Sequence, residues 1–375
     1  MPEAMSYLLA RKRSPLPDRG EQWETGLSEP SYVTPIDQKP REWKSAPYIS
    51  PDYSYVLQSK GSFQFSADQR ITDASADLCK LLLEREQMVP TESLFRDDIF
   101  KKTCQKLSHG NEARVIQDIA RLIIPSAETL ATFGSTHLDV LIESVNEGWN
   151  SIIPFCGPRP QPDYAVGFKR TAFTNEQLAK IKPFVGDPAG IDVETYFMAT
   201  MRMYFPFLTS EVCEAGSLVL ADCRNTHSMT VALRGIVELF RLVKREHEVH
   251  RQILAFSVSH NESFVGLYGH YPIIDKEKTR FYRHSIHEFS FITLDGKEKW
   301  TAYKFVKNVY EIWMPIHLKR LRSVIDSLPS GLNFELSELG KSERSGFSHG
   351  WEGYPLPDGG TADAVPVANI DQLGW

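Results

Sequence analysis

The chain has 375 residues, of which 42% are apolar and 24% are charged. This composition is typical of a globular protein, and the length is sufficient for a substantial core. The 48 acidic residues exceed the 42 Lys and Arg and give a net charge of -6. This balance argues against a dedicated binder of duplex DNA, because such proteins usually carry a basic surplus.

The five cysteines are scattered and form no CxxC pair, so the sequence predicts neither a disulfide framework nor a zinc site. No run approaches the 18 apolar residues that a membrane span requires. The first residues, MPEAMSYLLARKRSP, place the basic residues after a short apolar stretch, which is the reverse of the order in a signal peptide. We therefore expect a cytoplasmic protein with no membrane contact.

Composition divides the chain into three parts. Residues 1–61 are rich in Pro, Ser and charge without sustained periodicity, which favours a mostly disordered N-terminal arm. Residues 329–375 have the character of a flexible C-terminal tail. Residues 62–328 are expected to form a single α/β domain, with a helical lead-in at 62–135 and an insertion at 169–204.

Hydrophobic spacing predicts the elements of this domain in chain order. The predicted helices are 76–88, 112–125, 136–150, 225–251 and 297–328. In the third helix, one stripe carries Leu138, Leu141, Ile142 and Val145. Asn225 or Thr226 is expected to cap the fourth helix. The last helix is expected to be interrupted near Pro315. The predicted strands are 162–168, 205–213, 252–260, 263–274 and 279–294. The order helix, strand, strand, helix, strand is typical of an α/β fold with a mixed sheet.

Two predicted strands carry a spaced carboxylate motif. Pro162-Asp163 opens the first strand, and Glu211-Val212-Cys213 ends the second. This arrangement resembles the PD-(D/E)XK nuclease pattern, in which two carboxylates hold Mg²⁺ and a lysine helps to activate water. The resemblance implies a restriction-endonuclease-like α/β domain in which the two carboxylates lie close together on neighbouring strands.

The sequence departs from this pattern at the lysine, because Cys213 stands in its place. Without a cation from elsewhere, hydrolysis should be lost or slow. Lys169, Arg202 or Arg224 are candidates for such a cation, and Asp139, Glu143 or Glu147 are candidates for the acidic residue that the pattern places on the preceding helix.

The resemblance extends beyond the motif. Five blocks between about residue 120 and residue 328 are similar to an uncharacterised fungal family of the same fold. They are PRPQPDYAVGF, MRMYFPFLTSEV, NTHSMTVALRGIVELFRLVKRE, YGHYPIID and LDGKEKWTAYKFVKNVYEIWMPIHLKRL.

The string Asp139-Val-Leu-Ile-Glu143 suggests a more specific hypothesis about function. On a helix, residues four apart share a face, and a guanidinium would satisfy both carboxylates. The string resembles the motif of fungal arginine-containing cyclodipeptide synthases, which join arginyl-tRNA and a second aminoacyl-tRNA into a cyclic dipeptide. The resemblance implies an aminoacyltransferase of secondary metabolism with arginyl-tRNA as partner. No cofactor is required, because the substrate is already an activated ester, and no GxxxxGK[ST] motif is present.

Under this reading Asp139 and Glu143 serve as base and guanidinium anchor, and Asp163 and Glu211 complete the anionic pocket. Glu147, Cys213 and Arg224 are the expected substrate-binding residues. Residues 244–251 and 317–322 offer basic groups for the tRNA backbone, although each segment is more often simply a solvated helix face.

Two other interpretations stay open. The first is a Mg²⁺-dependent nuclease, or an inactive nucleic-acid-binding relative, in which Asp163 and Glu211 are the metal ligands. The second is a non-catalytic scaffold. The histidines lack HxxxH and HExxH spacing and are expected to be structural.

Overall fold

A computed structural model describes residues 7–12, 47–50, 52–108, 110–186, 193–213, 217–276 and 278–329. The expected flexible tail lies outside these residues except for Pro329, and so does most of the expected N-terminal arm. No helix among the described residues is both long and apolar enough to cross a membrane.

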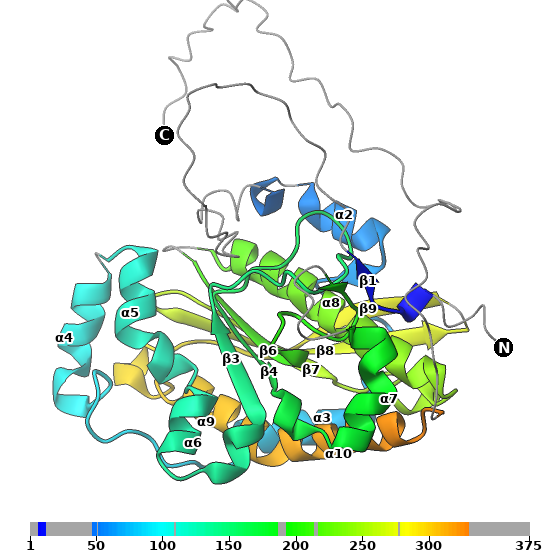
Figure 1. Cartoon of the computed structure of the whole chain (residues 1–375). Coiled ribbons are helices and arrows are strands. Elements are labelled where there is room, and N and C mark those ends of the chain that lie inside the picture. The colour runs from blue at the N-terminus through cyan, green and yellow to red at the C-terminus, as the bar shows by residue number, and fades with distance from the viewer. Residues whose placement is uncertain are drawn as a thin grey trace, which may run out of the picture. The chain divides into compact units, whose positions relative to one another are not determined.

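Seven strands of the described residues form one mixed sheet in the order β2-β9-β8-β7-β6-β4-β3 (Figure 1). Their bounds are β2 Ser62–Phe63, β3 Leu141–Val145, β4 Tyr164–Phe168, β6 Tyr204–Val212, β7 Ala255–His260, β8 Phe264–Asp275 and β9 Lys278–Ser290. The pairs β6/β7 and β2/β9 are parallel, and the other neighbours are antiparallel. The predicted mixed-sheet α/β class is therefore confirmed.

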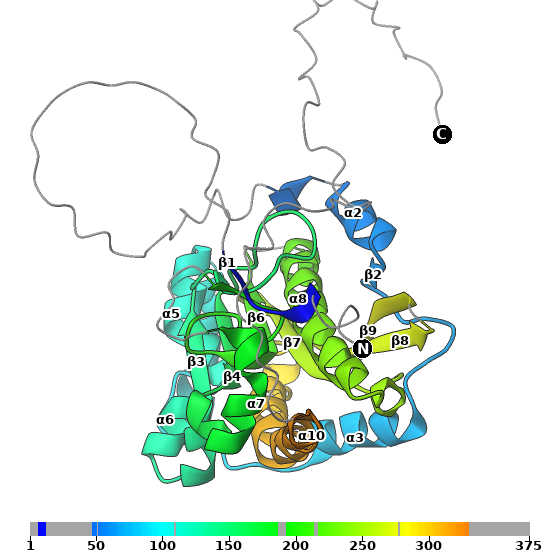
Figure 2. The same ribbon diagram turned by 45° about the vertical axis from the view of Figure 1, so that its right-hand side comes forward.

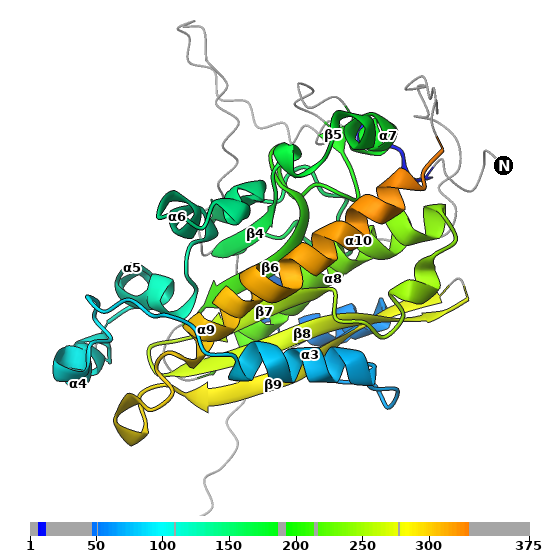
Figure 3. The same ribbon diagram turned by 90° about the horizontal axis from the view of Figure 1, so that it is seen from below.

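Helices cover both faces of this sheet. Helix α8 (Val219–Leu242) packs on one face, while α3 (Asp73–Glu84), α9 (Thr301–Asn308) and α10 (Met314–Asp326) lie on the other (Figures 1 and 3). Strands β4, β6 and β7 are buried along their whole length. On the α9 and α10 side, the Phe256 ring packs against Phe305 and Trp313.

Helix α8 begins earlier and ends earlier than its sequence predicts. Asn225 and Thr226 lie inside the helix, so the prediction that one of them caps it was wrong. The Asn225 amide instead accepts a hydrogen bond from Thr209 of β6 (2.7 Å) and donates one to Ser259 of β7 (2.9 Å). These polar side chains join α8 to the sheet at the place where the candidate site lies.

The predicted helix at 136–150 was also wrong. Residues Thr136–Val140 form a 3₁₀ turn, and Leu141–Val145 form strand β3. The apolar residues of this segment satisfy helical spacing, but pairing of β3 with β4 buries Leu141 and decides the structure. The supposed helix face with Asp139 and Glu143 therefore does not exist.

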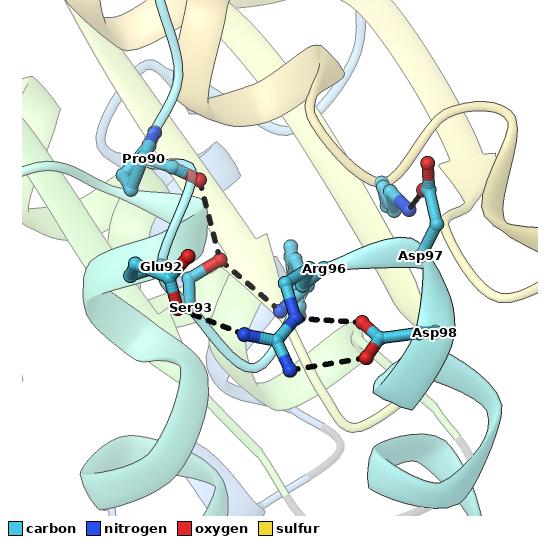
Figure 4. A network of polar contacts seen from close by, with 8 residues as sticks. Pro90, Glu92, Ser93, Arg96, Asp97 and Asp98 are labelled. Atoms are coloured by element: carbon cyan, nitrogen blue, oxygen red, sulfur yellow. Dashed lines mark hydrogen bonds and ion pairs between the residues drawn. The ribbon is translucent and has the colours of Figure 1, made fainter.

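The remaining elements follow the predictions more closely. Helix α3 and α5 (Glu112–Ile123) occupy the predicted lead-in together with α4 (Asp97–Leu107) and α6 (Ala127–Thr132), and α7 (Asn175–Val185) lies in the insertion. The last helix is interrupted by a π-helical turn at Val309–Trp313, just before Pro315. At the start of α4, Arg96 makes two hydrogen bonds to Asp98 and one to Glu92 (Figure 4). This network is exposed and is expected to contribute little to stability.

Part of the expected N-terminal arm packs on the domain. Leu8 and Ala10 are buried, and α2 (Tyr53–Ser59) lies over the same face of the sheet as α8 (Figures 1 and 2). Tyr48, Tyr53 and Leu57 are buried and form a small apolar cluster with Cys223 of α8. The segment thus covers the part of α8 that carries the candidate site.

Candidate functional site: a buried carboxylate pair under α8

The structure brings Asp163 and Glu211 together. Strands β4 and β6 are antiparallel, and Tyr164 pairs with Ser210, so Asp163 and Glu211 are the next residues outward. Residues opposite each other in an antiparallel pair project to the same face. Glu211 thus lies in β6, and Asp163 lies directly before the neighbouring strand β4. Their exposed fractions are only 6% and 1%.

Each of these carboxylates has a partner. Asp163 Oδ2 accepts a hydrogen bond from the backbone N–H of Val212 (2.9 Å). Glu211 Oε2 lies 3.4 Å from Nη1 of Arg224, which α8 places above the end of β6. The buried guanidinium offsets the unfavourable burial of the Glu211 charge.

Arg224 is thus the one of the three candidate cations that reaches the pair. Lys169 lies 3.6 Å from Glu128 of α6 instead. Arg202 is exposed, and the contact that the structure gives it is electrostatic, with Glu147.

Cys213 occupies the place of the nuclease lysine but cannot act as a cation. Its thiol lies 3.4 Å from the carbonyl of Ser217 and 3.8 Å from that of His260. Burial, reinforced by the negative charge of Asp222, raises the pKa of Cys213 to about 12. The side chain is therefore a neutral thiol at pH 7.

Two residues at the end of β7 were missed by sequence reasoning. His260 and Asn261 are fully buried, and their Nε2 and Nδ2 atoms have no hydrogen-bond partner among the described residues. Burial lowers the pKa of His260 to about 4, although its contact with the Asn261 carbonyl and the Asp163 charge act in the opposite direction. The imidazole is neutral at pH 7. Sequence placed both residues in a hairpin turn, and the parallel pairing of β6 with β7 brings that turn to Asp163.

A hydrogen bond beside the site joins the N-terminal segment to α8. The Tyr48 hydroxyl lies 2.8 Å from Nδ1 of His227, which is fully buried in α8. Burial and the neighbouring Glu211 charge both raise the pKa of Tyr48 far above its usual value. Tyr48 thus lies close to Glu211.

Glu143 lies on the opposite face of the sheet. In the register of the sheet, Glu143 of β3 pairs with Val166 of β4, and Val166 pairs with Leu208 of β6. Leu208 in turn pairs with Phe256 of β7, whose side chain lies on the face covered by α9 and α10. Its carboxylate accepts hydrogen bonds from the Ser126 hydroxyl and the Glu128 backbone N–H at the start of α6. Glu143 is therefore a helix-capping residue, and its expected place in one pocket with Asp163 and Glu211 was wrong.

Asp139 and Glu147 do not join the pair either. Both side chains are exposed, Asp139 in the 3₁₀ turn and Glu147 just after β3. Desolvation of the carboxylate by neighbouring protein groups raises the pKa of Glu147, and the charge of Arg202 opposes this shift. Within the described ranges, neither carboxylate bonds to Asp163 or Glu211.

The basic segments expected to hold a tRNA backbone are partly occupied by internal contacts. Arg245 forms an ion pair with Glu248 (2.6 Å), and Arg322 donates to the carbonyl of Ala172 (2.8 Å from Nε). His317 is buried against Trp313. Lys244, His247 and Lys319 are exposed.

These observations define an α/β domain with an enclosed polar site at one end of a mixed sheet. Residues 99–325 match the model of a family described as Domain of unknown function (DUF7924), and the chain belongs to this family. No curated protein and no solved structure matches the chain.

Proposed function

We propose that this domain is a tRNA-dependent aminoacyltransferase that forms an arginine-containing cyclic dipeptide from arginyl-tRNA and a second aminoacyl-tRNA. One observation carries the proposal: the buried Glu211 carboxylate binds a guanidinium, that of Arg224, beside a second buried carboxylate, Asp163. The resemblance of the sequence to the fungal arginine-containing cyclodipeptide synthases supplies the reaction. In this proposal the guanidinium of the substrate takes the place of Arg224 at Glu211.

The enclosure of the site supports a small substrate group. Asp163, Glu211 and Arg224 are each at most 6% exposed, so a single side chain fits such surroundings better than a bulky duplex does. A buried guanidinium gains most from carboxylates because charge-assisted hydrogen bonds are stronger where water is excluded.

The neighbouring residues offer the remaining chemistry. The Asp163 carboxylate accepts the proton of the attacking α-amino group, and the Asn261 amide donates to the oxyanion that forms on the ester carbonyl. The amine nitrogen bonds to the carbonyl carbon, and the ester bond to the tRNA hydroxyl breaks. A second transfer of the same kind closes the ring. The ester is already activated, so neither ATP nor another cofactor enters the reaction.

The proposal retains a PD-(D/E)XK-like fold with altered chemistry. The placement of Asp163 directly before β4 and of Glu211 in the neighbouring β6, on one face of the sheet, supports this fold. The neutral thiol of Cys213 is tolerated in aminoacyl transfer, because no water molecule has to be activated.

The same placement favours a second candidate, a Mg²⁺-dependent nuclease or an inactive nucleic-acid-binding relative. Asp163 and Glu211 would hold the metal, which would polarise a phosphate. The fit is poor, because Glu211 is paired with Arg224 and the described residues contain no group of three or more His, Cys, Asp or Glu placed to hold a metal. Mg²⁺-dependent cleavage by pure protein, lost in Asp163→Ala, would establish this candidate.

A direct test of the proposal uses purified protein with arginyl-tRNA and mixed aminoacyl-tRNAs. We expect a cyclic dipeptide from the wild type and none from Glu211→Gln, whose neutral amide cannot form an ion pair with the guanidinium. Arg224→Lys removes the internal guanidinium but keeps a positive charge near Glu211. This matched control should retain part of the cyclic dipeptide formation. Equal activity of wild type and Glu211→Gln would contradict the assignment of Glu211.

A further inference from the structure

The residues of the candidate site are buried, and the segment that precedes the domain packs beside them. Tyr48 lies against His227, and the Tyr53 hydroxyl bonds to the carbonyl of Cys156 (3.4 Å). Together with α2 these residues cover the α8 face near Glu211 (Figure 2). A substrate therefore reaches the carboxylates only if part of the structure moves.

The packing of this segment is separate from the main core. Tyr48, Tyr53, Leu57 and Cys223 form their own buried cluster, with Phe155, Cys156 and Leu220 packed against it. The main cluster extends over the sheet and the other helices and contains none of these four buried residues. A small satellite cluster of this kind can open at a lower free energy than the whole domain, because the main core is left intact.

The segment also has a defined pivot. Gly61 has φ +90°, a conformation that favours glycine, and it follows Lys60, the C-cap residue of α2. Beyond it, β2 pairs with β9, and the buried Ser62 hydroxyl lies 2.7 Å from that of Thr230 in α8. The chain is thus fixed at β2, and the contacts of the part before Gly61 include the satellite cluster and the Tyr48–His227 and Tyr53–Cys156 hydrogen bonds.

We propose that residues 47–50 and 52–60 form a lid that opens about Gly61 and admits the arginyl group to Asp163 and Glu211. The identity of the admitted group rests on the proposed function, whereas the opening does not. A lid of this kind also excludes water during transfer, and hydrolysis of the activated ester would otherwise compete.

Two native thiols report the opening without any assay of activity. Cys223 lies under the lid and Cys79 lies in the main core, and each is 4% exposed. Thiol labelling of the intact chain, mapped by mass spectrometry at increasing low urea concentrations, measures both rates relative to those of the unfolded chain. We expect Cys223 to label at least tenfold faster than Cys79 and to depend only weakly on urea, since lid opening exposes little surface.

Substitutions separate lid opening from global unfolding. Tyr48→Phe should speed the labelling of Cys223 about threefold to tenfold, because the hydrogen bond to His227 is lost. Ile325→Val, in the core face of α10, should speed the labelling of Cys79 by a similar factor and leave the labelling rate of Cys223 unchanged. Tyr55→Phe, which is 68% exposed in α2, is the matched control and should change neither rate.

The lid is refuted if Cys223 and Cys79 label at one rate with one urea dependence, or if Ile325→Val speeds both equally. Failure of the proposed function has a different signature, in which Cys223 labels fast and no cyclic dipeptide forms.

Discussion

Glu211 Oε2 and Arg224 Nη1 lie 3.4 Å apart in a region from which water is almost completely excluded. Removing one member of such a pair leaves a buried charge without its partner, which typically costs about 3–5 kcal/mol of stability. We expect Glu211→Leu and Arg224→Met to each lower the free energy of unfolding by about this amount. The double variant should recover most of the loss, because no uncompensated charge is left. Urea unfolding of all four proteins measures this coupling, and simple additivity would contradict it.

Glu143 should behave as a structural residue. Its carboxylate caps α6 through Ser126 and the Glu128 N–H, so Glu143→Ala should lower the free energy of unfolding by about 1–3 kcal/mol. Product formation by the folded variant should persist, because Glu143 lies on the other face of the sheet from Asp163. Asp139→Asn, at an exposed position, should change stability by less than about 0.5 kcal/mol. Loss of product in folded Glu143→Ala would contradict this prediction and would support the sequence-based role of Asp139 and Glu143 as base and guanidinium anchor.

The aminoacyltransferase proposal and the nuclease alternative predict different results for one substitution at position 213. Cys213→Lys places an ammonium near Asp163 and beside the guanidinium that Glu211 binds. Under the aminoacyltransferase proposal it competes with the substrate and weakens binding roughly tenfold or more. Cys213→Ser changes no charge and should retain most activity. Product yield and Mg²⁺-dependent cleavage are measured on both variants. Gain of cleavage in the lysine variant, or equal loss of product in both, would show that the pocket binds something else.

The sequence was sufficient to predict strands β4, β6, β7, β8 and β9 and half of the site, but not β2 or β3. The Pro162-Asp163 and Glu211-Val212-Cys213 motifs stand on strands whose apolar character is strong, so their adjacency could be predicted. Asp139 and Glu143 were misplaced because an amphipathic 3.6-residue pattern also fits a short turn followed by an edge strand. His260 and Asn261 could not be assigned, since only the parallel pairing of β7 with β6 brings them to Asp163.

Stability should fall in mild acid because four buried histidines are held neutral. Burial is the main cause that lowers the pKa of His227, His270 and His317 to about 3 and that of His260 to about 4. The unfolded chain binds their protons below pH ~6.5, where the native protein does not. The contribution is therefore complete above pH ~6.5 and is lost as the pH falls toward the native values, by about 1.4 kcal/mol per pH unit for each histidine.

Urea unfolding at pH 7.5 and pH 5.0 measures this loss. His317→Phe should reduce the pH dependence by about one histidine's share, since neither His317 ring nitrogen has a partner among the described residues and its ring stacks on Trp313. A protein equally stable at both pH values would contradict the prediction.

Arginine-containing cyclic dipeptide formation at the Asp163 and Glu211 pair is tested most directly in a host that expresses the chain and is fed isotope-labelled arginine. Mass spectrometry of the extract should show a new cyclic dipeptide that carries the label, and the product should be absent with Glu211→Gln expressed at the same level. No labelled product from the wild type, or the same product from both proteins, would contradict the account.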